Sequence, residues 1–125
     1  MSHLQTRLRE DLGTALRARD RATAGVLRTV LAAIANAEAQ PAPVLVSEAG
    51  GGDGPIARAA LGVGAAEVAR KELTEDDVRT VIAAERDERL HAADELAAHG
   101  REVPAAQLRH EAALLDRYLG GDPDR

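Results

Sequence analysis

Residues 71–89, KELTEDDVRTVIAAERDER, decide the fold of this chain, because they contain its clearest helix start and the beginning of a long apolar face. Thr74 and Asp77 have the spacing of a capping box, and the acidic first turn favours the positive end of a helix dipole. A helix is therefore predicted over about 74–98, ending at Gly100. Its apolar face consists of Val78, Val81, Ile82, Ala92, Ala93 and Leu96.

Two helices are predicted before this segment. Ser2 is a candidate N-cap for a helix over about 3–18, whose stripe contains Leu4, Leu8, Leu12, Ala15 and Leu16. Asp20 is a candidate cap for a helix over about 20–39, whose stripe contains Val26, Leu27, Val30, Leu31 and Ile34.

A fourth helix is predicted over about 104–119, because Pro104 suits a first turn and Gly120 and Gly121 end the pattern. Its stripe contains Leu108, Ala112, Leu115 and Leu119. Four amphipathic helices without alternating strand-like runs predict one all-α domain of antiparallel hairpins over 1–121. The tail 122–125 is expected to fray.

The second and third helices are separated by a segment rich in glycine and proline. We expect a mobile loop over 41–62, because Pro41, Pro43 and the run at 49–55 break helices and leave few apolar anchors. The run lacks the Gly-Lys-Ser/Thr ending of a phosphate-binding loop.

The composition limits the cellular locations expected for the protein. It has no cysteine, so disulfides and thiolate metal sites are excluded. Neither a signal peptide nor a run of about 20 apolar residues is recognisable. We expect a cytoplasmic protein with no membrane partner.

The charge is unevenly distributed. Net charge is −5, yet residues 1–30 hold six arginines against three carboxylates, a local charge of +3 that leaves −8 for the remainder. One tyrosine is the only aromatic residue, so base stacking is nearly excluded. We expect no DNA partner, whereas one basic face is still suited to RNA phosphates.

That basic face is the first candidate site. Arg21 and Arg28 lie seven residues apart, opposite the apolar stripe, and Arg17 and Arg19 precede them. Arg17, Arg21 and Arg28 are candidate contacts for an RNA backbone or an acidic partner. The alternative is an ordinary solvated face.

Two pairs at four-residue spacing have structural interpretations. Glu85 and Arg89 lie close to the apolar stripe, so they either form a buried ion pair that fixes helix docking or an ordinary surface pair. Leu114 and Tyr118 either broaden the buried face or form an exposed patch for self-association or a partner.

Catalytic and metal sites have little support in the sequence. His91, Glu95 and His99 share one helix side, which makes them weak metal-ligand candidates, although an exposed row lacks a fixed second shell. No serine, histidine and carboxylate set resembles a catalytic triad. We therefore expect no catalytic residues, no metal and no cofactor.

The order of several segments resembles the GatB/YqeY-like helical family. The similar segments are LRARD (16–20), VLRTVLAAIANAE (26–38), ELTEDDVRTVIAAERDER (72–89), HGRE (99–102) and EAALLDRYL (111–119). Longer members continue into a small C-terminal helical domain, similar to the part of the tRNA-dependent amidotransferase B subunit that helps hold tRNA. We expect this domain to be absent here.

The resemblance implies a non-catalytic helical interaction module, accessory to tRNA or the translation machinery, with an unidentified protein or tRNA as partner. An alternative is a subunit or associate of a glutamine-dependent tRNA amidotransferase, a carbon–nitrogen ligase. That label rests on family resemblance alone, because no residues match the glutaminase or kinase sites. A metal-binding helical protein is a third alternative.

Overall fold

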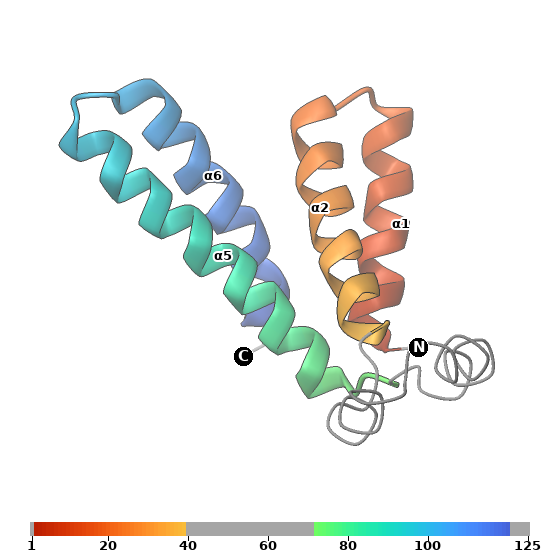
Figure 1. Cartoon of the computed structure of the whole chain (residues 1–125). Helices are drawn as coiled ribbons and strands as arrows, with labels where there is room; N and C mark the ends of the chain where they lie inside the picture. The colour runs from red at the N-terminus through yellow and green to blue at the C-terminus, as the bar shows by residue number, and fades with distance from the viewer. Residues whose placement is uncertain (1, 40–71, 121–125) are drawn as a thin grey trace, which may run out of the picture.

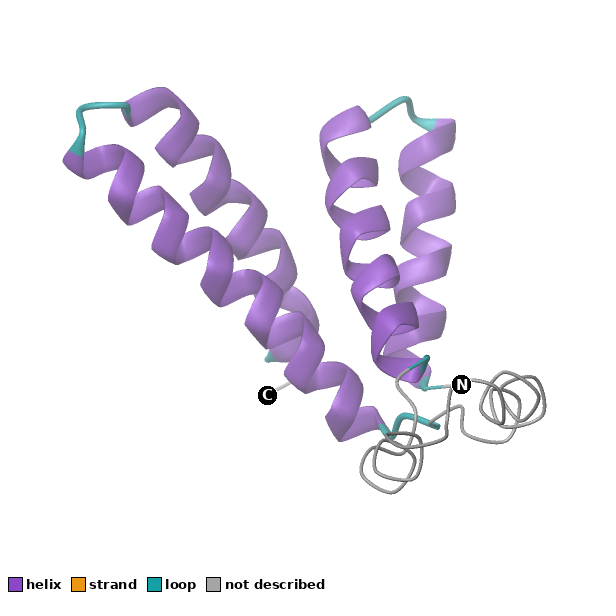
Figure 2. Cartoon of the chain, viewed as in Figure 1, coloured by secondary structure: helices purple, strands orange, loops and turns teal. Residues whose placement is uncertain are grey.

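Four helices make up the part of the chain that the structure, a computed structural model, describes, namely residues 2–39 and 72–120. They are α1 (His3–Arg17), α2 (Arg21–Glu38), α5 (Glu75–Ala98) and α6 (Glu102–Leu119). No strand occurs within these residues (Figure 2). The predicted loop 41–62 and tail 122–125 lie outside them.

The helices form two antiparallel hairpins, α1–α2 and α5–α6 (Figure 1). The hairpins meet at the end where α1 and α5 begin, and there the Glu75 carboxylate accepts the backbone N–H of Leu4 (3.5 Å). From this end they diverge toward their two turns (Figure 1). The predicted all-α arrangement of antiparallel hairpins is confirmed.

Local capping explains where three of the helices begin. Ser2 Oγ accepts the Gln5 N–H (2.9 Å), Thr74 Oγ1 accepts the Asp77 N–H (3.0 Å), and Asp20 Oδ1 caps α2. These hydrogen bonds satisfy N–H groups that have no partner inside the helix. All three were the predicted caps.

The fourth helix begins earlier than predicted. α6 starts at Glu102 without a side-chain cap, so Pro104 lies inside its first turn and not at its start. Proline is tolerated there because its missing N–H would have no intrahelical acceptor.

The core is aliphatic apart from Tyr118 and draws on all four helices. Its largest fully buried side chains include Leu8 of α1, Leu27 of α2, Ile82 of α5 and Leu115 of α6. The prediction that Leu16 continues the α1 stripe is wrong, because its relative exposure is 46%. Residues four apart drift around a helix of 3.6 residues per turn, so the buried position at that level passes to Ala15.

The two hairpin turns share one backbone motif but differ in its central residue. The N–H of Asp20 donates to the carbonyl five residues earlier (2.9 Å), and that of Arg101 does the same (2.8 Å). These bonds identify both turns as Schellman motifs, which place a left-handed residue after the helix. That residue is Arg19 (φ 60°) in the first turn and Gly100 (φ 76°) in the second.

The left-handed conformation costs a residue with a Cβ atom about 1 kcal/mol more than glycine. We therefore expect Arg19→Gly to raise the free energy of unfolding by about 1 kcal/mol. Gly100→Ala should lower it by a similar amount through the backbone alone, because the added Cβ would have no atom within 4 Å. Urea denaturation followed by circular dichroism measures both changes, and an unchanged midpoint for Arg19→Gly would show that its backbone is unstrained.

Candidate functional site

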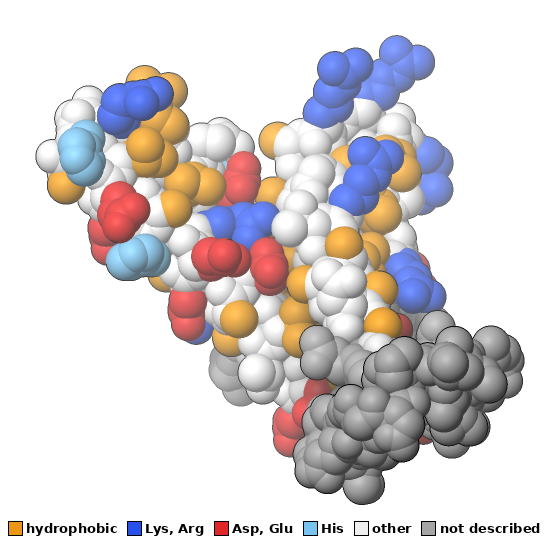
Figure 3. All heavy atoms as spheres, viewed as in Figure 1, with side chains coloured by type: hydrophobic (Ala, Val, Ile, Leu, Met, Phe, Trp, Pro, Cys, Tyr) orange, Lys and Arg blue, Asp and Glu red, His pale blue; other side chains and the backbone are white. Residues whose placement is uncertain are grey.

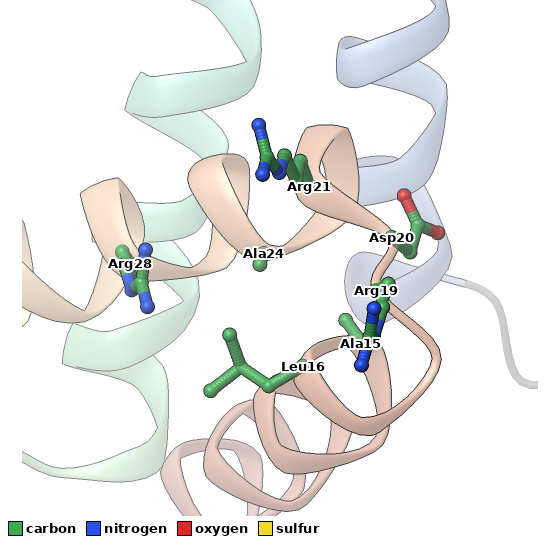
Figure 4. Close-up of a pocket in the computed structure, with 7 residues that line it drawn as sticks. All are labelled: Ala15, Leu16, Arg19, Asp20, Arg21, Ala24 and Arg28. Atoms are coloured by element: carbon green, nitrogen blue, oxygen red, sulfur yellow. The ribbon is translucent and has the colours of Figure 1, made fainter.

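A groove at the α1–α2 turn gathers three arginines of the first hairpin (Figure 4). We call it the arginine groove and define it by its lining residues, Ala15, Leu16, Arg19, Asp20, Arg21, Ala24 and Arg28. The side chains of Leu16 and Arg28 extend into the same space from the two helices (Figure 4). The groove therefore combines an apolar floor with a cationic rim.

Two of the three candidate contact arginines, Arg21 and Arg28, are among the residues that line the groove. The third candidate, Arg17, does not line it. Its guanidinium lies along α1, where it hydrogen-bonds Thr14 Oγ1 (3.4 Å). Arg19 lines the groove instead. Its left-handed backbone turns the chain away from the axis of α1 after Ala18.

The three groove arginines keep their charges unneutralised by the described part of the chain. Arg19, Arg21 and Arg28 are exposed, and none of their guanidinium groups forms an ion pair or hydrogen bond with a described residue. Asp20 is nearby, but its carboxylate accepts the Thr23 N–H (3.1 Å), which lowers its pKa. The rim can therefore attract an anionic ligand.

Charge on the visible face of the molecule follows the two hairpins. Figure 3 shows basic side chains over the α1–α2 hairpin, whereas most acidic side chains lie over α5–α6. The polarity expected from residues 1–30 is thus also a spatial polarity.

Glu85 and Arg89 form an ion pair that extends to a third residue. Arg89 contacts Glu85 (3.0 Å) within α5 and Glu111 (3.1 Å) on α6, and the side chains are only 13%, 17% and 21% exposed. Sequence spacing indicated the first contact but not Glu111, which lies 22 residues away. The cluster joins α5 to α6 where water is largely excluded.

Tyr118 is buried between the hairpins and does not form an exposed patch. Its hydroxyl donates to the Asp11 carboxylate, and the Arg7 guanidinium lies 4.7 Å from its ring centroid. Burial, followed by the hydrogen bond to Asp11, raises the pKa of Tyr118. Leu114 is partly buried against the same core.

The three weak metal-ligand candidates do not converge. His91 contacts the Glu95 carboxylate (3.4 Å), whereas His99 Nδ1 lies 2.9 Å from the Glu95 backbone carbonyl oxygen. Within residues 2–39 and 72–120, no three histidine or carboxylate side chains are grouped so that they could hold a metal ion.

None of the helices described in these residues has the length and apolar character needed to cross a membrane.

No family model, curated protein or solved structure matches this chain.

The buried cluster of Glu85, Arg89 and Glu111 predicts that two arginines joining α5 to α6 contribute unequally to stability. Arg89→Ala should lower the free energy of unfolding by about 2 kcal/mol, because it leaves two largely buried carboxylates without their cation. The matched control is Arg109→Ala, since Arg109 pairs with Asp94 at 3.5 Å with exposures of 45% and 79%. It should change stability by less than about 0.5 kcal/mol. Equal effects in chemical denaturation would refute a docking role for the cluster.

Tyr118 predicts a loss of stability at alkaline pH. Because its folded pKa is raised above the unfolded value of about 10, its contribution is complete below pH 10 and declines as the pH rises further. Tyr118→Phe should remove this alkaline slope and cost about 1 kcal/mol at neutral pH.

The absorbance of tyrosinate reports this residue alone, because the chain has one tyrosine and no tryptophan. Its titration midpoint should lie well above 10 in the folded protein and near 10 in urea. A folded midpoint near 10 would contradict the buried hydrogen bond.

Proposed function

We propose that this chain is a non-catalytic helical interaction module of the GatB/YqeY-like type, an accessory to the translation machinery that binds an anionic partner through the arginine groove. The observation that supports binding is the set of three exposed, unneutralised arginines on the rim of one groove. Cations gathered around a concave surface raise the local concentration of anionic ligands and accelerate their association.

Three titratable groups among the described residues have a shifted pKa, and none of these shifts creates a general acid or base for neutral pH. General acids and bases work best with pKa values near the operating pH. The shifts that the structure does produce lead away from neutrality: the pKa of Asp20 is lowered and those of Arg86 and Tyr118 are raised. Tyr118 is moreover engaged in the contact between the hairpins.

Affinity capture from native lysate tests this proposal. The tagged chain should retain a partner from the translation machinery, and the double variant Arg21→Gln/Arg28→Gln should retain several-fold less, because the rim loses two of its three charges. Arg17→Gln is the matched control, since it removes one arginine outside the groove.

A ribonuclease-treated arm shows whether RNA bridges the captured material. Equal capture by the double variant and the native chain would contradict a role for the groove. Recovery without any component of the translation machinery would contradict the accessory role.

A further inference from the structure

We infer that the arginine groove takes an acidic protein segment that also carries apolar side chains, and that Arg19 is a specificity residue for it. The inference rests on the proposed function and names the class of its partner. It draws on the apolar floor of the groove, the conformation of Arg19 and the spacing of the other two arginines.

The floor of the groove is apolar, and Leu16 is its accessible part. Ala15, Leu16 and Ala24 lie between the arginines, and Leu16 is 46% exposed although large aliphatic side chains gain most from burial. A single exposed leucine is ordinary on a protein surface. Leu16, however, extends into a hollow bounded by cations, where an apolar side chain of a partner can bury it (Figure 4).

Arg19 occupies a backbone position that disfavours any side chain. The equivalent position of the α5–α6 turn is Gly100, which adopts the left-handed conformation without strain. Both turns make the same hydrogen bonds, so the turn itself does not require arginine. Arg19 is therefore strained at a position where glycine would not be, and its side chain lines the groove. This combination indicates that the Arg19 guanidinium serves to bind a ligand and not to stabilise the fold.

The spacing of the other two arginines suits a peptide ligand. Arg21 and Arg28 are seven residues apart on one side of α2, which separates them by about 10 Å along the helix axis. Carboxylates two turns apart on a helix have the same separation. Leucine-sized side chains between such carboxylates would lie over Leu16.

An RNA backbone would contact the arginines of the groove but not its apolar floor. Phosphates recognise the arginines, but they leave the apolar floor uncovered. Bases that leave a stack usually pack on aromatic rings, and the chain's one aromatic residue, Tyr118, is buried between the hairpins. The apolar floor therefore favours a protein segment over RNA.

Fluorescence anisotropy with a labelled peptide tests the inference. The probe is an amphipathic helix of about 14 residues, four turns long, with glutamates and leucines on adjacent faces. The native chain should bind it saturably, and binding should weaken when alanines replace its leucines or glutamines replace its glutamates. Leu16→Ala should weaken binding about fivefold.

Arg19→Gly separates binding from folding. It should weaken peptide binding about three- to fivefold while the protein becomes more stable, an outcome that a merely structural role for Arg19 does not produce. Arg17→Gln, outside the groove, should leave the affinity within about twofold of the native value. A single-stranded RNA oligonucleotide of similar charge is the competing probe.

Three results would overturn the inference: no saturable peptide binding, peptide affinity insensitive to both Leu16→Ala and Arg19→Gly, or RNA binding that exceeds peptide binding and ignores Leu16→Ala. Lysate capture that still depends on Arg21 and Arg28 would then preserve the proposed function while the acidic-segment assignment is rejected.

Discussion

The contact between Tyr118 and α1 is the constraint on which the arrangement of the two hairpins depends. Tyr118 is the only aromatic side chain in the protein, and it lies buried near the end of α6. Its ring packs in the shared core and stacks under the guanidinium of Arg7, and its hydroxyl donates a hydrogen bond to the Asp11 carboxylate. Burial of the ring contributes apolar area that a small aliphatic core otherwise lacks, and the hydroxyl requires a partner once it is buried. The same residue therefore stabilises the core and fixes where the second hairpin meets α1.

The fold was largely predictable because its determinants are local. Caps at Ser2, Asp20 and Thr74 and a left-handed glycine at position 100 act within one turn of helix, so spacing along the chain suffices to find them. The prediction that Leu16 belongs to the buried face of α1 failed. Residues spaced by four stay on one face of a helix for only two or three turns before they rotate out of the core.

The candidate site was predictable only in part, since it depends on a turn and on contacts between distant residues. Arg21 and Arg28 share one helix, and their relation follows from periodicity. Arg17 and Arg19 flank the point where the helix ends, and helical periodicity does not extend across a left-handed residue. Two further contacts, Tyr118 with Asp11 and Arg89 with Glu111, join residues 107 and 22 positions apart, so pattern reasoning within one helix could not find them.

The hairpins diverge beyond two contacts, one near the start of α1 and α5 and one where Tyr118 meets Asp11, and we take the first as the pivot of a tilt between them (Figure 1). The 18 residues of α2 span about 27 Å, and the groove lies along the half of α2 farther from that pivot. A tilt of about 5° at the pivot would shift the groove by roughly 2 Å relative to α5–α6, an amplification typical of hinged elements. Such a tilt would change the position of the groove relative to the acidic hairpin without a change in the residues that line it.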